Sequence, residues 1–264
     1  MAARFPHRPW ISERLLISGS SILLFLAIWE AAFRFEWVNP IFISSPIRVA
    51  LAMGDVFSSA QFRGDMLISG SEFVIGYLMA IVVGVPLGLA VGWFKRLYFL
   101  LSPFIHTLNT IPRITLLPII IIWFGIGIWS KIIVVFLGAL IPILISTYAG
   151  VRTSEERFMR VARSFNASPA RVFRTVVLPG TVPYIFTGLK YGTGRALLGV
   201  IVGELYAATA GIGYFIASAG NAFQTDKMLV GVILVIVVGL VAMEALSRIE
   251  RRFDRWRPSV GSSE

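Results

Sequence analysis

Long apolar runs recur along most of this chain and constrain its fold more than any other feature. A helix needs about 20 mostly apolar residues to cross the hydrocarbon core of a bilayer. Such runs fill so much of the 264 residues that no large soluble domain fits beside them. The sequence therefore predicts an all-α integral membrane protein with six transmembrane helices in one domain, residues 1–264. The predicted spans are 15–33, 73–94, about 104–124, 132–150, about 181–206 and 228–247.

The composition excludes several classes of protein. Hydrophobic residues make up 56% of the chain and charged residues 14%, whereas soluble domains carry about 25% charged residues. This balance excludes a soluble enzyme and a disordered chain. The chain has no cysteine and two histidines, which lie far apart. We therefore expect no disulfide framework and no bound metal.

Basic residues mark one side of the predicted membrane protein. They concentrate near the N-terminus, at Lys95–Arg96, between Arg152 and Arg174, and between Arg248 and Arg257. Because cytoplasmic connections carry an excess of Lys and Arg, both termini are expected in the cytoplasm. No RNA-binding motif accompanies the positive charge, so membrane lipid is an expected partner and nucleic acid is not.

The segment 152–179, which we call the elbow, is the most informative connection between spans. Thr153 and Glu156 have the spacing of a capping box, which predicts a helix start there. Asn166 tolerates the left-handed conformation of a helix stop, and Ser168-Pro169 predicts the start of a second helix that ends at Leu178-Pro179. The pattern predicts a helix–turn–helix that docks in a partner's groove. A helix lying on anionic lipid is the alternative interpretation.

Glycines recur at helical spacing in two predicted spans. Gly84, Gly88 and Gly92 follow one another every fourth residue, and Gly188 and Gly192 repeat this spacing. Small residues at this interval let membrane helices approach closely. We interpret them as a packing face within one subunit, with a contact between two subunits as the alternative.

The elbow resembles the cytoplasmic signature of binding-protein-dependent ABC importer permeases. That signature reads Glu-Ala-Ala, three residues, Gly, nine residues, Ile, any residue, Leu and Pro. Here Arg160-Val161-Ala162 precedes Asn166, and Val176-Val-Leu-Pro179 follows at the same spacing. Arg160, Val161 and Asn166 depart from the signature. The stretches 109–131 and 178–214 are also similar to the nitrate, sulfonate and taurine branch of these permeases.

The resemblance implies a fold, a function and a set of partners. It implies a type I ABC importer permease in the bacterial inner membrane, forming the pathway for a small anion such as nitrate, a sulfonate or taurine. The chain has no phosphate-loop motif, so the resemblance places ATP and Mg on two separate ATPase subunits and no cofactor in this chain. It further implies a periplasmic or lipid-anchored solute-binding protein and a second permease copy, most simply in a homodimer. The residues it assigns to ATPase coupling are Arg160, Val161, Ala162, Asn166, Ala167, Ser168, Val176, Leu178 and Pro179.

Four charged residues in or beside the predicted spans are candidates for the substrate pathway. They are Arg113, Lys190, Arg195 and Glu204. Each needs a partner or water, because charge in hydrocarbon costs about 2.5–3.5 kcal/mol on insertion scales. Arg195 offers bidentate recognition of an oxyanion, and an ion pair that locks two helices is the alternative. For Arg113 the alternative is an arginine that reaches the membrane surface, and for Glu204 simple solvation at the rim.

A self-contained secondary transporter or channel is the alternative function. Such proteins place acidic residues near the membrane midplane. In this chain Glu30, Glu204 and Glu244 all lie near the ends of predicted spans. The sequence therefore favours a permease subunit that depends on an external ATPase.

Overall fold

The computed structural model describes residues 10–153 and 164–253, and every regular element in these ranges is helical. Within the described ranges, five helices are long and apolar enough to cross a membrane, or six if the bent pair α4–α5 counts as one span. The predicted all-α membrane fold is therefore confirmed. The elements are α1 (Trp10–Arg34), α2 (Pro46–Ser58), α3 (Ala60–Trp93), α4 (Lys95–Thr110), the 3-10 turn η1 (Arg113–Leu116), α5 (Leu117–Phe124), α6 (Ile128–Arg152), α8 (Pro169–Val172), the π-helical turn η2 (Phe173–Val177), α9 (Leu178–Ala207), α10 (Ile212–Asn221) and α11 (Thr225–Arg251).

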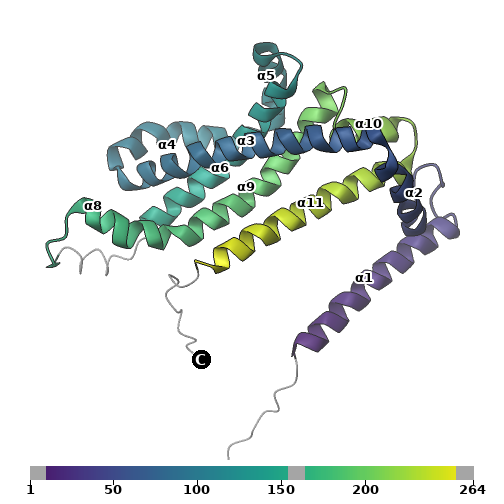
Figure 1. The fold of residues 1–264 in the computed structure, drawn as a ribbon, viewed down its shortest axis with the longest axis horizontal. Helices are drawn as coiled ribbons and strands as arrows, with labels where there is room; N and C mark the ends of the chain where they lie inside the picture. Colours follow the sequence, from purple (N-terminus) through teal and green to yellow (C-terminus); the bar gives the residue numbers. More distant parts are fainter. Residues whose placement is uncertain (1–9, 154–163, 254–264) are drawn as a thin grey trace, which may run out of the picture.

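Helices α3, α6 and α9 form the centre of the molecule, with α6 between the other two (Figure 1). Glycines bring the three backbones together. A Cβ on Gly88 of α3 would lie 2.7 Å from Thr147 Cβ of α6, and one on Gly188 of α9 would lie 2.9 Å from Ser146 Cβ. Gly92 and Gly192 also face α6 at close range. The interpretation of these glycines as a packing face within one subunit is confirmed.

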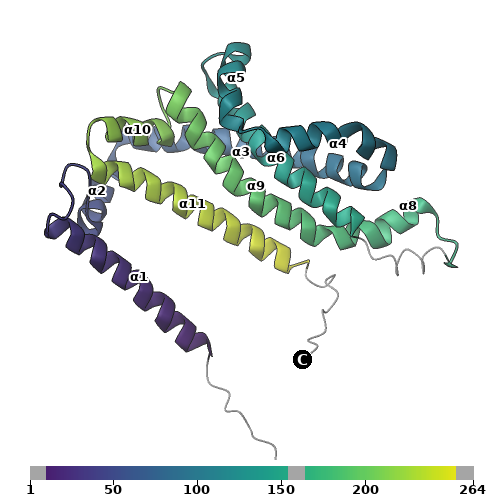
Figure 2. The ribbon, with the colours of Figure 1, turned by 180° about the vertical axis from the view of Figure 1, so that it is seen from behind.

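The remaining helices surround this centre. Helix α11 lies along α9, while α2 and α10 cross near one end of it (Figures 1 and 2). The C-terminal end of helix α1 lies near α2, and the rest of α1 extends away from the bundle. The Trp29 indole donates to the Ser44 carbonyl at 2.7 Å, which fixes the return of the chain after α1.

The prediction that the third span is one continuous helix is wrong. The chain bends by 95° between α4 and the segment Ile114–Phe124. Pro112 causes the break, because it has no N–H to donate and disfavours a helical conformation in the residue before it. Ile111 is accordingly extended, with φ −67° and ψ 126°. Helix α5 therefore projects from the bundle instead of continuing α4 (Figures 1 and 2).

Other boundaries also differ from the sequence prediction. Helix α3 begins at Ala60 rather than near residue 73, because its first turns carry polar residues that the search for apolar runs passes over. Two short helices, α2 and α10, were not predicted. Helix α2 begins with Ser45, whose hydroxyl accepts from the Arg48 N–H, followed by Pro46 in the first turn. This is a standard helix start.

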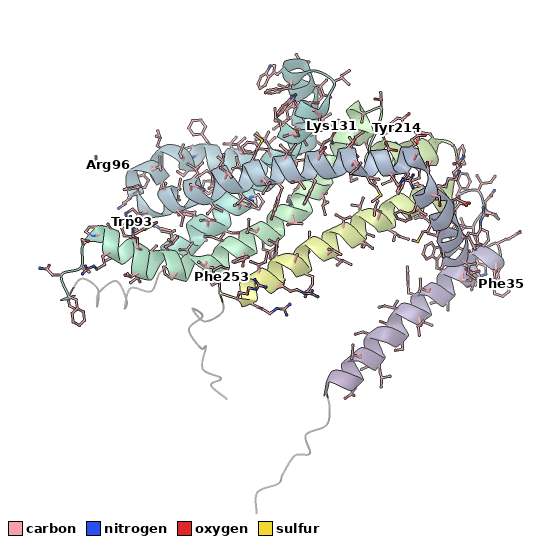
Figure 3. All side chains as sticks on the ribbon, viewed as in Figure 1. Phe35, Trp93, Arg96, Lys131, Tyr214 and Phe253 are labelled. Atoms are coloured by element: carbon pink, nitrogen blue, oxygen red, sulfur yellow. The ribbon has the colours of Figure 1, made fainter. Side chains whose placement is uncertain are left out.

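The two ends of the bundle differ in charge. The α3–α4 junction, the end of α6, the short α8 and the end of α11 lie toward one end, and Figure 3 shows Trp93 and Arg96 there. We call it the basic end, because Lys95, Arg96, Arg152 and Arg171 lie on these elements. Helices α2 and α10 lie toward the opposite end.

Candidate functional site

The described part of the elbow is a sharp turn followed by a capped helix. Asn166 has φ 54°, the left-handed conformation predicted for the helix stop. The Ser168 hydroxyl accepts from the Arg171 N–H at 3.4 Å, and Pro169 occupies the first turn of α8. Both features confirm the predicted start of the second elbow helix. Ala167 lies between them and is partly buried.

The beginning of the elbow is described only as far as Thr153. Thr153 follows the last residue of α6, and its hydroxyl donates to the Ala149 carbonyl. The rest of the predicted first helix, with Arg160, Val161 and Ala162, lies in 154–163, outside the described residues.

The second elbow helix does not end at Leu178-Pro179 as predicted. It runs from α8 through the π-helical turn η2 directly into α9, so residues 169–206 form one continuous helix. Pro179 lies inside this continuous helix, where its missing N–H removes one backbone hydrogen bond to the preceding turn. Val176, Leu178 and Pro179 are therefore partly buried helix residues at the junction of elbow and span.

A cavity of about 480 Å³ lies between three parts of the chain and opens on one face of the molecule, where several of its lining residues are exposed. The end of α4 and the bend after it form one wall, and α6 and α9 form the others. Pro142 of α6 has no N–H, which leaves the Gly138 carbonyl without its helical donor, and both residues line the cavity. The other lining residues are Asn109, Thr110, Ile111, Pro112, Ile114, Val134, Tyr191, Arg195, Leu198, Gly199 and Val202.

Arg195 is the charged residue among those that line this cavity. It lies about 25 Å along α9 from Leu178 and about 18 Å from Ala207, at a rise of 1.5 Å per residue. Arg195 is solvent-exposed in the single chain, and none of the ion pairs between described residues includes it. A guanidinium at this depth needs water, protein or an anion beside it.

The other candidate pathway residues lie elsewhere. The Lys190 ammonium is 2.5 Å from a carboxylate oxygen of Glu250, which joins α9 to α11. Glu204 is fully buried and faces α3 and α10, so solvation at the rim is wrong for this residue. Arg113 begins η1 next to the cavity residues Pro112 and Ile114, and its side chain lies outside the described part of the structure.

Glu204 belongs to a buried polar cluster that sequence reasoning missed. We define this cluster as Asp65, Ser69, Glu72, Lys131 and Glu204, all less than 9% exposed. Ser69 donates to Glu204 at 2.5 Å, and Lys131 lies 2.7 Å from Glu72. The three polar residues of α3 are spaced four and three apart, which places them on one helix face. That spacing was the available signal.

The polar cluster also holds the start of α10. Gly211 has φ 114°, a conformation that favours glycine. Its N–H donates to Asp65 at 2.8 Å, the next N–H donates to Ser69 at 2.8 Å, and the Gly213 N–H donates to Glu204 at 2.6 Å. Side chains of α3 and α9 thus satisfy N–H groups that a helix start leaves free.

A multi-pass helical bundle with a cavity deep between its spans and an elbow at its basic end defines a membrane transport subunit. The family described as "Binding-protein-dependent transport system inner membrane component" matches residues 73–255, and the chain belongs to this family. It is therefore the permease type of subunit in ABC importers, which work with ATPase and solute-binding partners.

Similar proteins include permeases with named substrates. The taurine transport system permease protein TauC of Escherichia coli K12 is 30% identical over 255 residues, covering 95% of this chain and 93% of that protein. The putative aliphatic sulfonates transport permease protein SsuC of Bacillus subtilis 168 is 31% identical over 234 residues, covering 89% and 85%. The Escherichia coli K12 protein of the same description is 34% identical over 237 residues, covering 89% of each.

Solved structures support the same fold. A chain of the MetNI methionine ABC transporter superposes with a TM-score of 0.63 at 18% identity, covering 73% of this chain and 96% of that one. A chain of an amino acid ABC transporter gives 0.60 at 17% identity, covering 76% and 97%. The predicted type I importer permease fold is confirmed.

Proposed function

We propose that this chain forms, with a second copy of itself, the pathway through which an ABC importer moves a small organic anion such as a sulfonate. The observation that carries the proposal is Arg195, a cation deep in the span that faces a cavity and has no ion-pair partner among the described residues. Among the described residues that line this cavity there is no carboxylate. Its lining therefore has a net positive charge, which favours an anion over a cation.

The chemistry of the cavity fits a small oxyanion. A guanidinium binds sulfonate or carboxylate oxygens through two parallel hydrogen bonds. Asn109, Thr110 and Tyr191 add neutral polar groups to the same lining. A volume of about 480 Å³ falls in the range of small-molecule sites, about 300–1,000 Å³. The taurine and aliphatic sulfonate permeases named above support this class of substrate.

The lining of the cavity supports a homodimer, because it is unsuited to contact with lipid. The bend at Ile111-Pro112 and the charged Arg195 both line it. Irregular backbone and a guanidinium are not stable against lipid tails. We therefore place a second copy over this face, related by a twofold axis, which is the commonest symmetry of homo-oligomers. The cavity then lies between two protomers and is shielded from lipid.

The positive charge of the basic end supports an orientation of the permease in the membrane. We place it in the cytoplasm of a bacterium, with both termini on that side of the inner membrane. Two ATPase subunits, which hold ATP and Mg, bind the elbows there, and the solute-binding protein delivers the anion at the end where α2 and α10 lie. Arg160, Val161, Ala162, Asn166, Ala167, Ser168, Val176, Leu178 and Pro179 are the proposed coupling residues.

Replacing Arg195 tests the proposal. In proteoliposomes that contain the full importer, Arg195→Ala should lower sulfonate uptake about 10- to 100-fold at subsaturating solute. This is the scale of losing a hydrogen-bonded charge contact of about 1.5–3 kcal/mol. Arg195→Lys should retain part of the uptake, because it keeps the charge and loses the bidentate geometry.

The controls separate recognition from assembly. Dimer formation and basal ATPase activity should be unchanged in both variants, and Arg252→Ala, at the exposed end of α11, controls for the loss of an arginine. If Arg195→Ala instead prevents assembly, Arg195 locks helices and the anion-binding role is wrong. Ion-driven flux through the purified chain without ATPase subunits would contradict the importer mechanism itself.

A further inference from the structure

The buried side chains at the junction of the elbow and α9 have a spacing that a regular α-helix does not produce. Val172, Val177 and Thr181 are 4%, 1% and 0% exposed. They are five and then four residues apart. At about 100° per residue, a step of four turns a side chain by about 40°, whereas a step of five turns it by about 140°. In an uninterrupted α-helix, Val172 would therefore point away from the face that Val177 and Thr181 share.

The π-helical turn η2 removes this mismatch. The Leu178 N–H donates to the Phe173 carbonyl, five residues back, instead of to the carbonyl four residues back. One extra residue is thereby accommodated in the turn. The step of five residues across this turn therefore rotates a side chain about as much as a step of four does in an α-helix. Val172 then lies on the same buried face as Val177 and Thr181. The extra residue keeps the elbow helix in phase with α9.

Phe173, next to Val172, and Thr181, on the buried face, contact two other helices of the centre. The Phe173 ring meets the Trp93 ring at the end of α3 edge to face, with centroids 5.0 Å apart. Thr181 lies against α6, where a Cβ on Gly150 would come within 2.9 Å of its Cγ2. The elbow helix thus contacts α3 at the point where α9 begins its close packing with α6.

Proline alone does not account for the π-helical turn. Pro183 lies inside α9, where the helix continues without a π-helical turn. The Thr187 hydroxyl donates to the Pro183 carbonyl at 3.0 Å, which shows how this helix accommodates a proline. The position of the extra residue therefore matches the need to orient the elbow.

We propose that the π-helical turn Phe173–Val177 sets the angular register of the elbow helix 169–177, so that this helix stays packed on α3 and moves with the α3–α6–α9 centre as one body. The inference rests on the proposed coupling function of the elbow. If the elbow rotated about α9, its Phe173–Trp93 contact would be lost and force on the elbow would turn its helix instead of moving the spans.

A deletion and an insertion at the same exposed place test the register. Deleting Arg174 removes the extra residue and converts the turn to α-helix without rotating the elbow. Inserting Ala between Arg174 and Thr175 rotates the elbow by about 100°. Arg174→Ala controls for the lost charge, because Arg174 and Thr175 are both exposed.

Thiol labelling and ATPase activity report on the register and its consequence separately. The chain has no cysteine, so Val172→Cys and Arg171→Cys give single reporters in the permease purified without its ATPase subunits, which leaves the elbow uncovered. In the parent and in the Arg174 deletion, a maleimide should label Cys at 172 at least tenfold more slowly than at 171. In the insertion variant this protection should be lost. Solute-stimulated ATPase activity should stay within about threefold in the deletion and fall at least tenfold in the insertion.

Two results would overturn the inference. Protection of position 172 in the insertion variant would show that the number of residues in the turn does not set the register. Loss of stimulation in an assembled Arg174 deletion that keeps this protection would show that the π-helical turn is a moving joint. If labelling follows the register but the insertion leaves ATPase stimulation intact, the register assignment stands and the coupling function proposed for the elbow is wrong.

Discussion

At the residue scale, most charged side chains inside the bundle have partners on a different helix. Glu72 of α3 lies 2.7 Å from Lys131 of α6, with side chains 0% and 8% exposed, and Lys190 of α9 pairs with Glu250 of α11. Removing one partner of such a buried pair leaves an uncompensated charge, whereas replacing both with apolar residues avoids that cost. Arg195 differs from these residues because it faces a cavity.

The buried Glu72–Lys131 pair gives a prediction about stability. Lys131→Met should leave the Glu72 carboxylate unpaired and lower the free energy of unfolding by about 3–5 kcal/mol. The double variant Glu72→Leu/Lys131→Met should recover most of this loss. Thermal unfolding of the purified permease in one detergent measures both variants. A double variant as unstable as Lys131→Met would contradict the pairing.

At the element scale, the centre of the molecule depends on glycines that allow backbones to meet. The Cβ of an alanine at Gly88 would lie 2.8 Å from the Leu144 carbonyl oxygen of α6, and that atom cannot move without displacing the helix. A Cβ on Gly70, in the same helix, would meet no atom within 4 Å. The two glycines of this helix therefore differ in what they allow: close packing on α6 at Gly88 and no close contact at Gly70.

These two glycines form a matched pair of substitutions. Gly88→Ala should destabilise the permease by about 1–3 kcal/mol, the usual cost of overpacking. Gly70→Ala should be neutral or stabilise it by up to about 1 kcal/mol, because alanine is the better helix former. Melting temperatures of the two variants provide the test. Equal effects would show that α3 and α6 are not in contact at Gly88.

At the scale of the whole molecule, the two ends of the bundle differ in charge. The α3–α4 junction with Arg96 and the described part of the elbow lie at the basic end, whereas Asn39 lies in the connection between α1 and α2 at the other. Because positive residues are retained in the cytoplasm, this separation predicts the orientation of the permease.

Single cysteines test that orientation directly, since the chain has none of its own. In intact cells, an impermeant thiol reagent that reaches the outer face of the inner membrane should label Asn39→Cys. Arg96→Cys should react only after the membrane is opened. Both positions are exposed in the structure, so burial does not explain a difference. The reverse pattern of labelling would overturn the proposed cytoplasmic location of the elbow.

The sequence by itself determined the features that depend on local chemistry. Apolar runs of sufficient length identified the spans, since hydrocarbon requires them, and glycine spacing identified the packing face. Asn166 and Ser168-Pro169 identified the elbow turn, because left-handed conformation and helix capping are properties of single residues and their neighbours.

Only the tertiary structure decided which distant residues meet. In the polar cluster, Asp65 accepts from a helix start that lies 146 residues later in the chain. A local sequence pattern cannot predict a contact between residues so far apart. The sequence contains the proline at which the helix breaks, Pro112. The 95° angle of the bend, however, depends on where α5 packs. The continuation of the elbow into α9 depends on the π-helical turn, whose extra residue is favourable only because Val172, Val177 and Thr181 are buried together against neighbouring helices. Side-chain partners across helices are set by packing, and packing is a property of the assembled bundle.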